Sequence, residues 1–250
     1  MNFQVRKQKI VEKLDQTGHC TVKELAAYLD TTTITVRRDL VLLAEQGFLV
    51  RTYGGAMKAS LSHLPVSFLQ KTRVNADQKE SICRSAASLI QDGDVVFLDC
   101  GSTVFRICPF IRHLKIKVVT NSLPIVNELI DSAVSLNFIG GEVDKERQAT
   151  HGVLAVRHVK YYRATKAFVG IDGISLKNGL SASSEKEAEM TTVLAQNAQE
   201  TYFLCDSTKL EKDRYFPFAP INFVQNLITD DQVADDVLAA YQAVGIRILK

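Results

Sequence analysis

From residue 76 onward the chain alternates between helical and strand-like segments, and this alternation constrains the fold more than any other feature. A helical pattern over residues 81–90 leads through the Asp92-Gly93-Asp94 turn to the apolar run Val95–Leu98. Further strand-like runs follow at residues 116–119, 134–139, 166–169, 201–204, 226–229 and 246–249. Strands separated by helices predict an α/β domain, with a parallel or mostly parallel sheet covered on both faces.

Polar turns, several with glycine, follow five of these runs. Ligands in such folds bind beyond the carboxyl ends of the strands, so we expect the turns to converge on one crevice. In Asp99–Thr103 a glycine, a helix start and two hydroxyls meet the requirements of a phosphate cradle, and Lys209 adds positive charge. The candidate effector-binding residues are Asp99, Gly101, Ser102, Thr103, Thr120, Asn121, Ser122, Gly140, Gly141, Asp172 and Lys209. Taken one at a time, each turn is more simply a helix cap.

Three other residues near these turns have simpler interpretations. Arg147 either lies on a loop over the crevice or is an ordinary surface arginine. We favour the second interpretation. Cys100 has no histidine near it in sequence and is expected to fill space rather than react. Pro109 disturbs the helix after the cradle if it lies beyond the first turn.

Composition excludes several classes of protein. The 250 residues are 46% hydrophobic and contain no run long enough to span a bilayer, and the first residues lack a signal-peptide core. The five cysteines are scattered and the five histidines have no metal-ligand spacing. We therefore expect a cytoplasmic protein without membrane attachment, metal or cofactor.

The net charge of +2 is unevenly distributed. Residues 1–58 contain nine basic and six acidic side chains, a charge of +3, while the remainder has 21 basic and 22 acidic ones, a charge of −1. A basic N-terminal segment is a weak electrostatic indication of nucleic-acid binding.

The N-terminal segment has the pattern of three short helices. Val5, Ile10, Val11 and Leu14 suggest an apolar face on a first helix closed by Thr17-Gly18. Thr21 and Glu24 have capping-box spacing and begin a second helix.

A third helix is predicted from an N-cap at Thr32 to Gln46, with Gly47 after it. Its buried stripe is Val36, Leu40 and Leu43, and its opposite face carries Ile34, Arg38 and Val41. A tight break before the last of three helices predicts a helix-turn-helix that reads the major groove.

The segment after this helix alternates like a strand from Phe48 to Tyr53 and runs into Gly54-Gly55, which predicts a β-hairpin, or wing. Guanidinium groups suit phosphates and guanine edges. The candidate DNA-binding residues are Thr32, Thr33, Ile34, Thr35, Arg37, Arg38, Arg51 and Tyr53. The alternative is a small helical domain whose charges are only a solvated surface.

The run LDTTTITVRRDL, residues 29–40, followed by RTYGGA, residues 51–56, resembles the signature of the DeoR family of bacterial repressors. That family has T-I-R-R-D-L in the recognition helix and R-x-H-G-G-A in the wing. Here Val36 replaces the isoleucine and Tyr53 the histidine. The D-T-T and R-T-Y-G-G variants are most similar to the glucitol-operon branch.

The resemblance extends over nearly the whole chain. Arg73, Asn75 and Lys79 approximate the family's R-x-x-N-x-x-E-K segment, although we expect Lys79 to be a solvated helix residue. The later motifs D-C-G-S-T, T-N-S, G-G, D-G and D-S-T-K resemble the family's sensor domain. This implies a winged helix-turn-helix over residues 1–57, a linker over 58–75, and over 76–250 a Rossmann-like domain related to ribose-5-phosphate isomerase and CoA-transferase folds.

The resemblance also implies a function. We expect a transcriptional repressor of a carbohydrate-utilisation operon, acting as a homo-oligomer (dimer or tetramer) that binds operator DNA and is released by a phosphorylated sugar or sugar alcohol. One rival is an isomerase or transferase on the same fold, with Asp99, Asp172 or Asp206 as the base. A metabolic enzyme has no use for the DNA-binding module, so we do not expect an enzyme. The other rival is an architectural DNA binder, which has no need of anion-binding turns.

Overall fold

The structure is a computed structural model that describes residues 2–46, 48–52, 54–58, 71–72 and 74–250. The chain divides into two compact units, Met1–Leu64 and Pro65–Lys250. Of the residues named above, Gly47, Tyr53 and Arg73 lie outside the described part.

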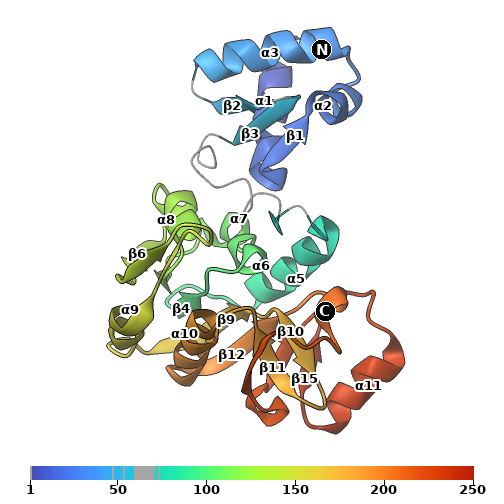
Figure 1. The fold of residues 1–250 in the computed structure, drawn as a ribbon. Coiled ribbons are helices and arrows are strands. Elements are labelled where there is room, and N and C mark those ends of the chain that lie inside the picture. The colour runs from blue at the N-terminus through green and yellow to red at the C-terminus, as the bar shows by residue number, and fades with distance from the viewer. Residues whose placement is uncertain (1, 47, 53, 59–70, 73) are drawn as a thin grey trace. The chain divides into compact units, whose positions relative to one another are not determined.

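The N-terminal unit is a helix-turn-helix with a three-stranded sheet (Figure 1). Its elements are α1 (Phe3–Thr17), β1 (His19–Thr21), α2 (Val22–Tyr28), α3 (Thr33–Glu45), β2 (Leu49–Thr52) and β3 (Gly55–Lys58). The strands pair antiparallel in the order β1-β3-β2. The three helices and the hairpin are confirmed, whereas the three-residue strand β1 was not expected from the sequence.

Local signals set the ends of these helices. Gly18 ends α1 in the left-handed conformation, with φ of 72°. The capping box of Thr21 and Glu24 is formed in both directions at the start of α2. Thr32 caps α3, and its hydroxyl accepts a hydrogen bond from the Thr35 amide at 3.2 Å.

One core joins these helices. Ile10 and Leu14 of α1 are buried with Val36, Leu40 and Leu43 of α3. The expected position of Val5 on this face is wrong, because Val5 is 43% exposed. It precedes Ile10 by five residues, which places the two about 140° apart around a helix that turns about 100° per residue.

The C-terminal unit is built on a seven-stranded sheet. Its strands are β4 (Val95–Leu98), β5 (Lys117–Thr120), β6 (Ser135–Phe138), β9 (Ala164–Gly170), β12 (Ala198–Leu204), β14 (Asn226–Ile228) and β15 (Arg247–Leu249). They lie in the order β15-β14-β12-β9-β4-β5-β6, and every pairing is parallel. Each strand coincides with a run predicted from the sequence, and the α/β fold class is confirmed.

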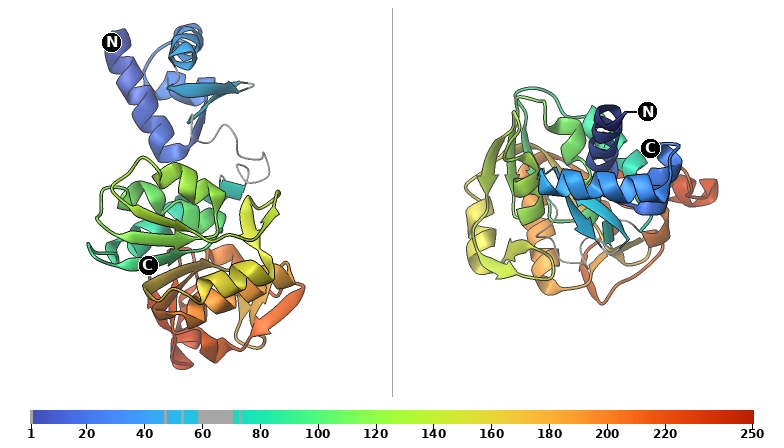
Figure 2. Two further views of the ribbon diagram at one scale, coloured as in Figure 1. Left: turned by 90° about the vertical axis from the view of Figure 1, so that its left-hand side faces the viewer. Right: turned by 90° about the horizontal axis from the view of Figure 1, so that it is seen from above.

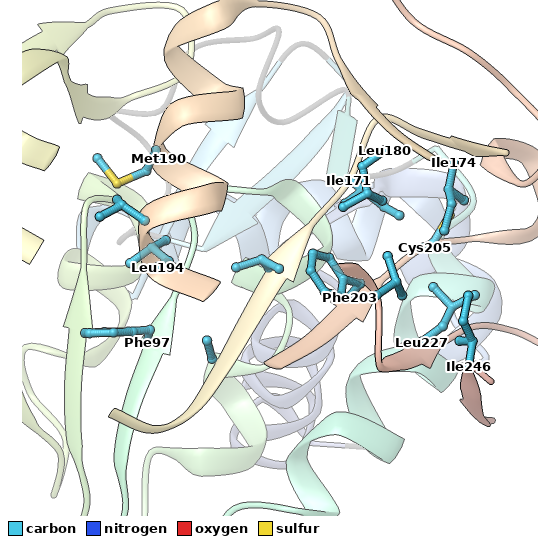
Figure 3. Packing of buried hydrophobic residues seen from close by; sticks show 14 of the residues in the cluster. Phe97, Ile171, Ile174, Leu180, Met190, Leu194, Phe203, Cys205, Leu227 and Ile246 are labelled. Carbon is cyan, nitrogen blue, oxygen red and sulfur yellow. The ribbon is translucent and has the colours of Figure 1, made fainter. Parts of the chain in front are cut away.

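Helices cover both faces of this sheet (Figure 2). They are α5 (Ala76–Ser88), α6 (Ser102–Phe105), α7 (Cys108–Ile111), α8 (Leu123–Leu129), α9 (Gly152–Val159), α10 (Glu185–Gln196) and α11 (Asp235–Ala243). Phe97 and Phe203 share one core with Met190 and Leu194 of α10 (Figure 3). The neighbouring residues Val96, Leu98 and Phe168, which point to the other face, are equally buried.

Two small antiparallel sheets complete the unit and were not expected from the sequence. One is the hairpin of β7 (Glu142–Asp144) and β8 (Ala149–His151). The other has the order β10-β11-β13 and consists of Gly173–Ser175, Gly179–Ala182 and Phe216–Ala219. These short strands contain glycine, proline or polar residues and lack the apolar runs that marked the strands of the large sheet.

Within the part of the chain that the structure describes, no helix combines the length and apolar character needed to cross a bilayer.

Candidate DNA interface and ligand cavity

The exposed face of α3 carries most of the candidate DNA-binding residues. Ile34 is 75% exposed, and Arg37 and Arg38 are exposed beside it, while Val36 and Leu40 are buried on the opposite side. An apolar side chain this exposed and flanked by two arginines fits a surface that contacts base edges and phosphates.

The threonines at the start of α3 have a structural role as well. The hydroxyl groups of Thr32 and Thr35 lie 3.0 Å apart, and Thr32 is exposed whereas Thr33 and Thr35 are half-buried. Arg51 of β2 is exposed on the wing. Tyr53, the last candidate, lies outside the described residues.

Asp39 fixes α3 against α1, a contact that the sequence analysis did not identify. The Arg6 guanidinium donates from Nε to Asp39 Oδ2 at 2.6 Å and from Nη2 to Oδ1 at 3.0 Å. Only 3% of Asp39 is exposed, and its hydrogen bond raises the pKa of Arg6. This bidentate pair holds the carboxylate next to Arg38 away from the face that DNA would approach.

A cavity of about 540 Å³ lies in the C-terminal unit at the carboxyl ends of β4, β9 and β12. Three of the five predicted turns contribute to it. Six of the candidate effector-binding residues line it, namely Asp99, Gly101, Ser102, Thr103, Asp172 and Lys209. The polar turns at 99–103, 172 and 206–209 therefore converge as expected for a parallel sheet.

The turn after β4 forms a tight backbone loop at the floor of the cavity. A Cβ on Gly101 would lie 3.5 Å from Gly170 Cα on the neighbouring strand, an ordinary van der Waals contact, so the space at this position does not itself require a glycine. Asp99 accepts hydrogen bonds from the amides of Cys100, at 2.6 Å, and Gly170, at 3.2 Å. Burial of the carboxyl group raises the pKa of Asp99.

Pro109 leaves this loop undisturbed. The segment after the cradle forms two four-residue helices, and Pro109 lies in the first turn of α7, where its missing N–H costs no helical hydrogen bond. Cys100 is buried, and burial raises the pKa of its thiol well above the ordinary value, which agrees with the expected space-filling role.

Two lysines face the cavity from opposite elements. Lys79 of α5 is 4% exposed, and its ammonium donates to the Lys71 carbonyl at 2.5 Å and to Ser102 Oγ at 3.4 Å. The expectation that Lys79 is a solvated residue is therefore wrong, because the first turn of α5 places its ammonium group beside Ser102 in the turn after β4. Lys209 donates to the Ile171 carbonyl at 2.8 Å.

The ammonium group of Lys209 destabilises the charge on Lys79. Burial lowers the pKa of Lys79 to about 8, and repulsion from Lys209 contributes to the shift. Thr103 and Thr208 add hydroxyls to the same lining. A polar recess is suited to binding an anion when it contains a buried cation whose positive charge is not fully balanced by negative groups.

Acidic groups line the other side of the cavity and are bridged by an arginine. Arg147, at the tip of the β7–β8 hairpin, forms ion pairs with Glu187 of α10 and, at 3.8 Å, with Asp172. The interpretation of Arg147 as an ordinary surface residue is therefore wrong. Asp172 also accepts from the Ser183 amide at 3.0 Å and hydroxyl at 2.6 Å. Burial acts to raise the pKa of Asp172, but these bonds and the Arg147 charge outweigh it and lower the pKa.

The other two predicted turns do not reach the cavity. Thr120, Asn121 and Ser122 are fully buried. The Asn121 amide donates to the Thr150 carbonyl at 3.0 Å, and Ser122 Oγ accepts from the Ile125 amide to cap α8.

The β7–β8 hairpin is the reason for this separation. It packs on these turns, and a Cβ on Gly141 would meet the His151 carbonyl at 2.7 Å. Gly140 and Gly141 are likewise absent from the cavity lining. The expected convergence is thus corrected from five turns to three.

Several lining residues were missed in the sequence. Asn75 donates from Nδ2 to Asp206 Oδ1 at 3.1 Å, and Thr208 donates to the same carboxylate. Arg214 donates from Nε to the Asp172 carbonyl at 2.9 Å. The sequence did contain one signal for these lining residues: Asn75 and Lys79 are spaced one helical turn apart, which places them on the same side of a helix.

Comparison with known proteins covers almost the whole chain. Residues 74–231 match the DeoR C-terminal sensor domain, and residues 6–60 match the DeoR-like helix-turn-helix domain. The lactose phosphotransferase system repressor of Lactococcus lactis subsp. lactis is 34% identical over 246 residues, which are 96% of this chain and 96% of that protein. The transcriptional repressor GlcR of Bacillus subtilis (strain 168) is 31% identical over 222 residues, 88% of this chain and 86% of that protein.

Among solved structures, ribose 5-phosphate isomerase A of Methanocaldococcus jannaschii is similar at 21% identity, with a TM-score of 0.39 over 54% of this chain and 55% of that chain. The matches to both domain families and the similarity to full-length repressors show that the chain belongs to the DeoR family of transcriptional regulators.

Proposed function

We propose that this protein represses a carbohydrate-utilisation operon and is released from its operator when a phosphorylated sugar or sugar alcohol binds in the C-terminal cavity. The observation that carries the proposal is the pair of lysines at the sheet's carboxyl end. Lys79 is buried with its pKa lowered to about 8, and Lys209 lines the same cavity and contributes to that shift.

A phosphate dianion would relieve this repulsion. It would bring opposite charge to both ammonium groups, and the hydroxyls of Ser102 and Thr208 would donate to its oxygens. The remaining volume of the cavity, lined by carboxylates and guanidinium groups, suits the hydroxyls of a polyol.

The N-terminal unit supplies the DNA-binding function. The exposed Ile34, Arg37 and Arg38 on α3 and Arg51 on the wing form the surface that we propose enters the major groove and contacts the adjacent backbone. An operator with two half-sites about 34 Å apart would require two copies of the chain, hence the proposed homo-oligomer.

The rival hypothesis of an isomerase or transferase is not supported. The relatives are named as transcriptional repressors. The carboxylates considered as a catalytic base are already engaged: Asp99 by two backbone amides, Asp172 by Ser183, and Asp206 by Asn75 and Thr208. The protein is a regulator, not an enzyme.

Release from DNA requires that the effector bind the two states of the protein with different affinity. A tenfold to hundredfold loss of operator affinity needs a coupling of only about 1.4 to 2.8 kcal/mol. A ligand that binds both states equally would shift nothing.

Calorimetric titration of the full chain tests the ligand assignment. We expect at least one hexose, hexitol or pentose phosphate to bind, its unphosphorylated parent to bind at least a hundredfold more weakly, and Lys209→Ala to abolish binding. Lys212→Ala, an exposed lysine outside the cavity lining, is the matched control. Equal affinity for parent and phosphate, or equal losses in both variants, would refute the assignment.

A further inference from the structure

Charged side chains of both signs line the cavity. Lys79 of α5 and Lys209 lie with Asp99 and Asp206 at the turns after β4 and β12, whereas Asp172, Glu146 and Glu187 lie with the tip of the β7–β8 hairpin. The three acids of this second group, with Arg147 and Arg214, form what we call the acidic rim.

Arg147 neutralises only part of the acidic rim. Its guanidinium contacts both Asp172 and Glu187, whose side chains are 30% and 13% exposed. Glu146, next to it on the hairpin, has no ion-pair partner among the described residues, and Arg214 is occupied with the Asp172 carbonyl. Three carboxylates against two guanidinium groups leave the acidic rim with a charge of about −1.

The hydrogen-bonding capacity of the acidic rim suits neutral hydroxyls. A hydroxyl can donate to a carboxylate oxygen of Asp172 or Glu187 and accept from the Arg147 guanidinium at the same time. A second phosphate or a carboxylate can only accept, and it would approach the residual negative charge.

We propose that the acidic rim restricts the effector to molecules with one anionic group and a neutral, hydroxyl-bearing remainder, and that Arg147 and Glu187 determine this specificity. The inference rests on the proposed function, since it presupposes that the phosphate lies near Lys79 and Lys209. Two unit charges about 8 Å apart, at an effective dielectric constant of about 20, repel each other strongly enough to weaken binding roughly thirtyfold. We therefore expect a ligand with a second anionic group to bind at least tenfold more weakly than its singly anionic counterpart.

Matched pairs of ligands test the proposal by calorimetry on the full chain. Glucitol 6-phosphate and 6-phosphogluconate share one carbon chain and differ at C1, where a hydroxymethyl group replaces a carboxylate. Fructose 6-phosphate and fructose 1,6-bisphosphate differ by one phosphate. For each monophosphate that binds, we expect its doubly anionic counterpart to bind at least tenfold more weakly.

Two substitutions should shift this ratio in opposite directions. Glu187→Gln removes one negative charge and should reduce the discrimination to within threefold. Arg147→Gln removes the neutralising charge and should increase it at least threefold. Glu189→Gln, an exposed acid of α10 outside the cavity, should leave the ratio unchanged.

The outcomes separate this inference from the proposed function. Counterparts that bind as tightly as the monophosphates, or variants that shift the ratio in one common direction, would overturn the inference and leave the proposed function intact. Absence of binding by every monophosphate would overturn both.

Discussion

Raising the pH from 7 to 9 should weaken the binding of a phosphorylated effector about tenfold, because Lys79 loses its proton over this interval. Burial, together with repulsion from Lys209, lowers the pKa of Lys79 to about 8 in the ligand-free protein. A phosphate has its second pKa near 6, so it stays a dianion over the whole interval.

The magnitude follows from the fraction of protonated lysine. With a pKa of about 8, roughly 90% of Lys79 is charged at pH 7 and roughly 10% at pH 9. If the dianion binds only the charged form, the affinity falls by the ratio of these fractions. Binding should also raise the pKa of Lys79, so complex formation at pH 8 should take up about half a proton.

The stability of the ligand-free protein should change in the opposite direction. The pKa of Lys79 is lower in the folded state than its ordinary value of 10.5, so the folded state binds fewer protons between about pH 8 and pH 10.5. The contribution of Lys79 to the free energy of unfolding therefore rises with pH across that window, by up to about 3 kcal/mol.

Calorimetric titrations at pH 7, 8 and 9 measure the affinity, and titrations at pH 8 in two buffers of different ionisation enthalpy measure the proton uptake. Lys79→Met should bind weakly, with no dependence on pH over this range. An affinity that is constant between pH 7 and pH 9 in the unmodified chain, or an equal slope in Lys79→Met, would refute the reasoning.

Three further predictions concern the two units separately. Ser102→Ala or Lys209→Ala should abolish release by the effector while operator affinity stays within about threefold, as measured by anisotropy of labelled DNA; loss of operator binding first would contradict the division of labour. Arg38→Ala should weaken operator binding at least tenfold without lowering the melting temperature, a loss of about 1.4–3 kcal/mol in binding free energy. Arg6→Ala should destabilise the N-terminal unit by about 3 kcal/mol in thermal unfolding, because it leaves the buried Asp39 carboxylate unpaired; an unchanged transition would contradict this role.

The sheet and the recognition helix could be predicted from the sequence because their signals are local. The runs around Val95–Leu98 and Thr201–Leu204 are short, apolar and separated by helices, a pattern with few alternatives in an α/β fold. The caps at Thr21 and Thr32 depend on residues three positions away and formed as expected.

The cavity could be predicted only in part. The turns at Asp99 and Lys209 follow β4 and β12, which both pair with β9, so the strand order brings them together. The turn at Asn121 has the same local pattern, but a hairpin of two three-residue strands packs over it. Such an insertion leaves no periodic signal in the sequence.

Two charged residues were misassigned for a related reason. Lys79 and Arg147 have long side chains whose usual place is in solvent, and nothing adjacent to them in the chain indicates burial. Lys79 is buried because α5 packs under the β4 turn, and Arg147 is held by carboxylates that lie 25 and 40 residues further along the chain. Contacts of this separation are decided by tertiary packing.

Operator release tests the central claim most directly. Fluorescence anisotropy of a labelled duplex from upstream of the neighbouring sugar-utilisation genes would be titrated with the full chain, alone and with each sugar phosphate and its unphosphorylated parent. We predict sequence-specific binding that one phosphorylated compound weakens at least tenfold while its parent has no effect. Specific binding that no phosphorylated compound changes would contradict the assignment of the cavity as the effector site.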